Sequence, residues 1–172
     1  MNWIIVREML FEATLQLFEG CGSTILDARP TTPSTDTSST LSVIGFAGKQ
    51  VRGSLVLCLY PGLLRASYPT KDELTDEDLL AWSGELSNQL LGRLKNKLVA
   101  RGVSINLSKP TALSGTGMRF GTALPTSELI ERAFSYAGEP VLVRLEARAS
   151  AGVELREPDP VSSSNEGDMI LF

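Results

Sequence analysis

The clearest pattern of hydrophobic and polar positions covers residues 75–101. Hydrophobic residues recur there at spacings of three and four, which predicts a helix with one buried stripe. The stripe consists of Leu79, Trp82, Leu86, Leu90, Leu94 and Leu98. Thr75 is placed to cap the helix, acidic residues fill its first turn, and basic residues fill its later turns. Both ends therefore complement the helix dipole, and the sequence predicts one long amphipathic helix.

Shorter patterns predict the rest of the fold. A helix is expected from residue 2 to about residue 19, where glycines end it, and a short helix at 61–67. Apolar runs and alternations predict strands at 41–47, 51–60, 103–109, 111–113, 118–123 and 141–149. Residues 127–136 are predicted as a helical turn, and 153–156 as a hairpin partner for 141–149. The expected fold class is α+β, a mostly antiparallel β-sheet packed against two long α-helices.

The amino-acid composition limits the kinds of chemistry that the protein can perform. The chain has 172 residues, 42% of them hydrophobic and 21% charged, which suits one soluble domain. A net charge of −4 disfavours nucleic-acid binding. The sequence contains no histidine, which excludes Ser-His-Asp and Cys-His catalysis and histidine-ligated metals. We therefore expect no metal site. We also expect no membrane insertion and a cytoplasmic location, since no apolar run approaches the ~20 residues that span a bilayer.

The two cysteines are too few for a disulfide framework or a zinc site. Cys58 lies in an apolar run and is predicted to be a small buried residue, whereas Cys21 stands between two glycines. Chemistry in this chain must therefore use carboxylates, amides, hydroxyls, lysine or arginine.

The face of the long helix opposite the leucine stripe carries the candidate site. At about 100° per residue, Glu85, Asn88 and Gly92 fall close together there. Lys95 lies at the edge of the same face. Asparagine is a weak helix former and a mid-helix glycine costs about 1 kcal/mol, so neither is the expected filler for a surface without a partner. The spacing alone also fits an ordinary solvated helix face.

Several segments resemble one known family. Residues 84–96, GELSNQLLGRLKN, resemble the signature helix of the CheX family of chemotaxis phosphatases, which are related to CheC and to the FliY branch of flagellar switch proteins. The glycine-punctuated segments 44–48 and 53–57 resemble the hairpin of that family. Lys-Pro-Thr at 109–111 and Ser-Gly-Thr-Gly at 114–117 resemble the segment after its helix.

The resemblance implies a function in which Glu85 and Asn88 act on another protein. Asn88 would enter the active site of a phosphorylated response-regulator receiver and orient a water molecule for attack on its aspartyl phosphate. Glu85 would pair with the lysine beside that phosphate. The chain would need no cofactor of its own, and Mg²⁺ is expected in the receiver. Gly92 and Lys95 are expected partner-binding residues, Gly92 by giving clearance and Lys95 by steering an acidic pocket.

The resemblance also implies a single site and a dimer. CheC-type relatives carry a second E-x-x-N pair in the first helix, but this chain has Glu12 followed by Leu15. A homodimer formed through the sheets is expected, and an edge strand at 141–149 is one candidate for the contact. The alternative to a phosphatase is a non-catalytic module that binds a receiver or another chemosensory or motility protein.

Domain boundaries follow from composition. Residues 1–156 are predicted to form the CheX-like phosphatase domain, with a mobile Pro/Ser/Thr-rich loop at 29–40. Residues 157–172 are predicted to be a flexible tail. The tail ends in a hydrophobic segment that is either an ordinary terminus or a short docking motif: Met169, Ile170, Leu171 and Phe172.

Overall fold

The computed structural model describes residues 1–20, 25–27, 38–70, 73–118, 127–136 and 138–158. The helices in these residues are α1 (Trp3–Gly20), α2 (Pro61–Ser67) and α3 (Asp76–Val99). The strands are β1 (Ile25–Asp27), β2 (Ser39–Ala47), β3 (Val51–Leu59), β4 (Asn106–Leu107), β5 (Thr111–Gly115), β6 (Glu128–Tyr136) and β7 (Glu139–Ala149). The predicted antiparallel α+β architecture is confirmed, with three helices among the described residues.

The strands form one sheet, and every pairing between described strands is antiparallel. The strand order is β1-β6-β7-β3-β2-β4, and β5 also pairs with β2. The β2–β3 hairpin turns at 48–50, as the sequence predicts, with the Gly48 amide donating to the Val51 carbonyl at 2.8 Å. A Cβ on Gly48 would meet the Ser104 carbonyl oxygen, so a close backbone approach requires glycine there.

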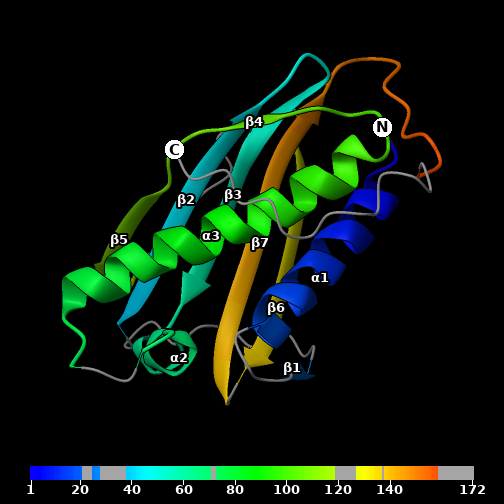
Figure 1. Ribbon diagram of the computed structural model, residues 1–172. Coiled ribbons are helices and arrows are strands. Elements are labelled where there is room, and N and C mark those ends of the chain that lie inside the picture. The colour runs from blue at the N-terminus through cyan, green and yellow to red at the C-terminus, as the bar shows by residue number, and fades with distance from the viewer. Residues whose placement is uncertain (21–24, 28–37, 71–72, 119–126, 137, 159–172) are drawn as a thin grey trace.

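Both long helices lie on the same face of the sheet, with α3 crossing in front of β2, β3 and β7 and α1 beside it (Figure 1). Buried side chains from α1, α3 and one face of β2, β3, β6 and β7 form a single core. The predicted stripe of α3 faces this core, with its five leucines at most 5% exposed and Trp82 half-buried. Cys58 is also buried, as predicted, but it alternates with Leu57 and Leu59 and so lies on the other face of the sheet.

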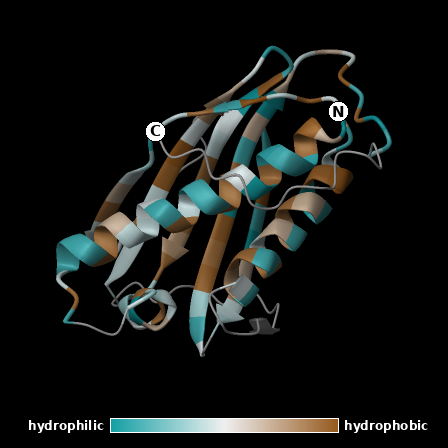
Figure 2. Cartoon of the chain, viewed as in Figure 1, coloured by the Kyte–Doolittle hydropathy of each residue, from teal (hydrophilic) through white to brown (hydrophobic). Residues whose placement is uncertain are grey.

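Hydropathy colouring shows the same layering. In Figure 2 the stretch of β7 below α3 is mostly brown, whereas the middle turns of α3 that face the viewer are mostly teal and white. No described helix is long and apolar enough to cross a membrane.

Residues 128–136 form strand β6, so the helical turn predicted at 127–136 is wrong. Ile130 and Phe134 of β6 are buried in the core, but Arg132 stands between them in the same phase of the alternation. The Arg132 guanidinium lies over the ring of Phe11, 4.3 Å from its centroid. Arg132 is exposed, so a charged residue interrupts the apolar alternation of the strand while it contacts α1 through a cation–π interaction.

The prediction of residues 141–149 as an edge strand is also wrong. Strand β7 pairs with β3 on one side and with β6 on the other, so it lies inside the sheet. Its charged positions are tolerated there because they find partners across the strands, as in the ion pair between Arg144 and Glu131 at 3.3 Å. Residues 153–156 form no strand with it, and Val153 packs into the core instead.

Other boundaries differ in detail. Strand β2 begins at Ser39, inside the loop predicted at 29–40. The strand predicted at 103–109 is reduced to Asn106–Leu107, while Val103 and Ile105 are buried. Residues 28–37, 119–126 and the hydrophobic C-terminal end lie outside the described residues, and so does Cys21. The domain boundary at residue 156 therefore stays a prediction.

Candidate functional site

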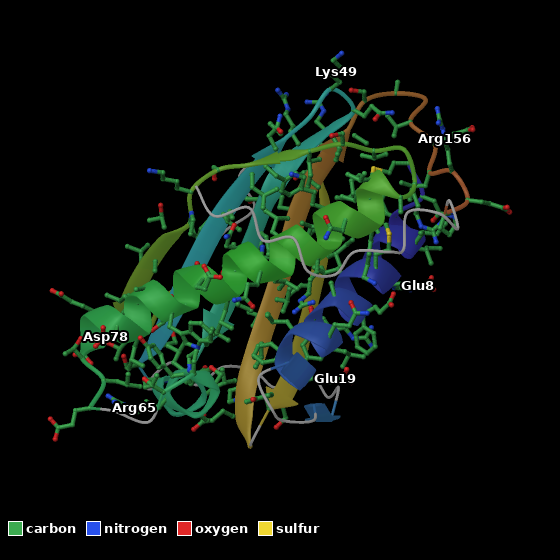
Figure 3. All side chains as sticks on the ribbon, viewed as in Figure 1. Glu8, Glu19, Lys49, Arg65, Asp78 and Arg156 are labelled. Atoms are coloured by element: carbon green, nitrogen blue, oxygen red, sulfur yellow. The ribbon has the colours of Figure 1, made fainter. Side chains whose placement is uncertain are left out.

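Helix α3 is fixed at its start by a capping box. The Thr75 hydroxyl accepts a hydrogen bond from the Asp78 amide at 3.2 Å, and the Thr75 amide donates to the Asp78 carboxylate at 2.9 Å. The Thr75 hydroxyl also donates to that carboxylate, at 2.6 Å. These hydrogen bonds lower the pKa of the Asp78 carboxyl group. Figure 3 shows Asp78 at the start of α3, where this capping box orders the first turn of the helix.

The outer face of α3 presents Glu85 and Asn88 side by side. Glu85 is half-buried, Asn88 is exposed, and the intervening Leu86 and Ser87 are buried. Among the hydrogen bonds of the described residues, none involves the Asn88 side chain. The amide of Asn88 is therefore free to bind a group on another molecule.

Gly92 lies on the same face, one turn beyond Asn88. A Cβ placed on Gly92 would have no described neighbour within 4 Å, so internal packing gives no reason for a glycine there. Gly84 differs, because a Cβ there would lie 3.4 Å from Pro110. The open space at Gly92 is consistent with a surface that another protein's backbone can approach.

Lys95 is half-buried near the end of this face. Among ion pairs between described residues, none uses Lys95, whereas Lys97 pairs with Glu12 of α1 at 2.9 Å. Lys95 therefore remains available to an acidic partner, and Lys97 ties the two long helices together.

The first helix carries no equivalent site. Glu12 accepts from Gln16 at 3.3 Å as well as pairing with Lys97, and Leu15, at the position of the amide, is half-buried. Leu15 thus offers no amide at the position that corresponds to Asn88, and the expectation of a single site stays a prediction.

The described residues offer little that would suit small-molecule chemistry. They contain no group of three or more Cys, Asp or Glu side chains arranged to hold a metal ion. Burial raises the pKa of the Cys58 thiol, which makes it a poor nucleophile. A hollow of about 340 Å³ is lined by residues of α1, β6 and β7, including Trp3 and Arg148, and by none of the candidate site residues. The candidate site lies outside this hollow, on the outer surface of α3, where a macromolecular partner could reach it.

Sequence reasoning missed Gln89. Its side-chain amide nitrogen donates to a Glu85 carboxylate oxygen at 2.9 Å. The signal was present, because a Glu and a Gln four residues apart on a helix are neighbours.

The fold and this helix surface define a class of protein: an antiparallel sheet with two long helices on one face, one of which presents an acid, an amide and a glycine to solvent. A putative chemotaxis protein from Desulfovibrio vulgaris Hildenborough shares the fold with a TM-score of 0.70 and 19% identity, over 86% of this chain and 99% of that one. A CheC-like protein from Shewanella sp. PV-4 gives 0.68 and 20% identity, over 87% and 100%. A chain of the CheX–CheY–BeF3–Mg²⁺ complex from Borrelia burgdorferi gives 0.57 and 19%, over 82% and 96%.

Residues 40–127, just over half of the chain, match the model of the family described as Chemotaxis phosphatase CheX. The chain belongs to the CheX family, which confirms the resemblance drawn from its motifs. The matched span contains all of α3 and therefore the whole candidate site. No curated protein sequence gives a significant match to the chain.

Proposed function

We propose that this protein is a protein-aspartate phosphatase that docks α3 on a phosphorylated response-regulator receiver. The observation that carries the proposal is the placement of Glu85 and Asn88 on the outward face of α3, with the Asn88 amide unpartnered among the described residues. The membership of the chain in a family described as chemotaxis phosphatases supports the same function.

Most of the groups needed for this hydrolysis would be supplied by the receiver. An aspartyl phosphate is a reactive acyl phosphate, and the receiver would supply Mg²⁺ to neutralise charge on the phosphoryl group. What remains is to hold a water molecule in line with the phosphorus, which an uncharged amide can do. Asn88 would position that water, and Glu85 would bind the receiver lysine next to the phosphate. Water attack breaks the phosphorus–oxygen bond, leaving the receiver aspartate and inorganic phosphate.

The kind of partner follows from a solved relative. The Borrelia burgdorferi CheX forms a complex with CheY, BeF3 and Mg²⁺, in which the last three together represent a phosphorylated receiver. A CheY-like receiver with its own Mg²⁺ is therefore the proposed partner here, and such a partner implies a cytoplasmic location. We further propose a homodimer, whose contact must involve surfaces other than the paired edges of β7. Lys95, free of ion pairs among the described residues, would attract the acidic pocket of the receiver.

A second candidate function is a non-catalytic receiver-binding module, because a shared fold does not guarantee activity. The experiment that separates the two follows the decay of a radiolabelled phospho-receiver with and without the protein. The proposal expects faster decay, and loss of the acceleration by on the order of 100-fold in Asn88→Ala.

Asn96→Ala is the matched control for that experiment. Asn96 is an exposed amide on the same helix, eight residues or about 12 Å beyond Asn88, and its replacement should leave the decay unchanged. Binding of a receiver without any acceleration of its decay would favour the non-catalytic module. Equal activity of Asn88→Ala and the wild-type protein would remove the proposed mechanism.

A further inference from the structure

We propose that Gln89 is a positioning residue that holds the Glu85 carboxylate away from Asn88, and so keeps both groups free for the receiver. This inference rests on the proposed function for its partner. It begins from one contact, the hydrogen bond from the Gln89 side-chain amide to Glu85 at 2.9 Å.

Helix geometry gives that contact a direction. At about 100° per residue, Gln89 lies about 40° from Glu85 on one side, and Asn88 lies about 60° from Glu85 on the other. A hydrogen bond to Gln89 therefore draws the carboxylate to the side away from Asn88. The pair is partly buried, which favours one persistent arrangement over an average of several.

Without Gln89, the Asn88 amide could become a hydrogen-bond donor to Glu85. An acid and an amide three residues apart on a helix are neighbours and can hydrogen-bond to each other. An Asn88 amide bound by Glu85 could not also orient water. The structure shows the opposite arrangement, in which Glu85 bonds to Gln89 and the Asn88 side chain has no partner among the described residues.

The contact leaves Glu85 able to bind the receiver. A carboxylate has two oxygens and about four acceptor positions, and Gln89 uses one of them. The remaining positions can accept a lysine ammonium group, and the side chain is already ordered when the receiver arrives. Pre-ordering of this kind improves affinity because less conformational entropy is lost on binding.

The alternative is a purely structural role, in which the Glu85–Gln89 pair only stabilises the helix. The chain provides a matched control for this, because Gln16 donates to Glu12 in α1 with the same four-residue spacing, at 3.3 Å. Gln89→Met and Gln16→Met each remove one such pair with a residue of similar size and helix propensity. If the pairs act only on helix stability, both variants should lose stability equally and neither should change receiver binding.

The test is a double-mutant cycle on binding to a beryllofluoride-activated receiver, measured by titration calorimetry. Gln89→Met should weaken binding on the order of fivefold, with an unchanged melting temperature. The same substitution in a Glu85→Ala background should have no effect, and Gln16→Met should bind as the wild type does. An equal loss in both backgrounds, or no loss in either, would overturn the proposal.

A receiver-free measurement keeps this inference distinct from the proposed function. In a ¹H–¹⁵N spectrum, the side-chain amide signals of Asn88 should move in Gln89→Met, because Glu85 turns toward Asn88, and should not move in Gln16→Met. Unmoved Asn88 signals in Gln89→Met would overturn the role of Gln89 whether or not a receiver is hydrolysed. A receiver that binds but is not dephosphorylated would instead count against the phosphatase proposal alone.

Discussion

The two long helices carry the same acid–glutamine pair and use it differently. In α1 the Glu12 carboxylate accepts from Gln16, and in α3 the Glu85 carboxylate accepts from Gln89, at 3.3 and 2.9 Å. Among the ion pairs between described residues, one joins the α1 pair to the neighbouring helix, through Lys97 at 2.9 Å, and none involves Glu85. The carboxylate of α1 is therefore part of the contact between the helices, while that of α3 remains available to a partner.

The positions between and beyond these pairs complete the difference. Where α3 has the exposed Asn88, α1 has the half-buried Leu15, and where α3 has Gly92, α1 has the exposed Glu19. Figure 3 shows Glu8 and Glu19 projecting from the outer side of α1. The Glu12 carboxylate therefore has neither an amide nor a glycine beside it, and both are parts of the docking surface proposed for α3.

The largest effect on receiver binding is expected from closing the open space at Gly92. Gly92→Ala should weaken receiver binding about tenfold, since a methyl group would stand where the partner approaches. The same substitution should raise the free energy of unfolding by about 1 kcal/mol, because alanine favours the helix and meets no neighbour within 4 Å. Binding is measured by titration, and stability by urea unfolding.

Gly84→Ala is the control for Gly92→Ala. It adds the same methyl group two turns earlier in α3, at a buried position where the new carbon would lie 3.4 Å from Pro110, and should leave receiver binding unchanged. A Gly92→Ala protein that is more stable and binds normally would show that the open space has no role in docking.

The amphipathic elements could be predicted from sequence, and the sheet interior could not. Local spacing predicts helix α3, and turn residues predict the β2–β3 hairpin, so the positions of both could be predicted from the sequence. Strand β6 was missed because the exposed Arg132 breaks the apolar alternation, and its contact with the ring of Phe11 in α1 does not appear in the local pattern. The interior position of β7 depends on its two neighbours, which no local pattern contains.

Some features of the candidate site could likewise be predicted from the sequence, and others depend on how the helices pack. The outward direction of Glu85 and Asn88 follows from the phase of the leucine stripe, which one helix determines by itself. That Glu12 is held by Lys97 depends on how α1 and α3 pack, so sequence alone showed only that Leu15 replaces the amide. The roles of Glu85, Asn88, Gly92 and Lys95 remain proposals until a receiver is tested.

The two long helices also differ at their N-termini. Removing the N-terminal cap of α3 is expected to have an effect on stability that is intermediate among these predictions. Helix α1 begins with Asn2, whose side-chain oxygen accepts from the Ile4 amide at 3.1 Å and does not titrate. Helix α3 uses the Thr75–Asp78 box, so Thr75→Ala should lower the free energy of unfolding by about 1 kcal/mol. Because folding lowers the pKa of Asp78, its contribution is present above the ordinary carboxyl pKa and is lost as pH falls through the folded-state value.

That acid dependence separates the two caps. Unfolding measured by urea between about pH 6 and pH 2 should lose part of its pH dependence in Asp78→Asn. Asn2→Ala should instead destabilise the protein by a similar amount across that range. An unchanged pH dependence in Asp78→Asn would show that the capping carboxylate contributes nothing as an anion.

The smallest effects are expected from replacing two lysines near the end of α3. One replacement should change stability and the other should change the rate of receiver association. Lys97→Ala removes the ion pair with Glu12, which is partly exposed, so the free energy of unfolding should fall by less than about 1 kcal/mol. Lys95→Ala removes no ion pair between described residues and should leave stability unchanged, but it should slow receiver association about threefold at low salt. Stopped-flow association at two salt concentrations measures the second effect, which should vanish at high salt because screening removes long-range attraction. If Lys97→Ala slows association as much as Lys95→Ala does, the attraction comes from the net charge of the helix end, and Lys95 has no special place in docking.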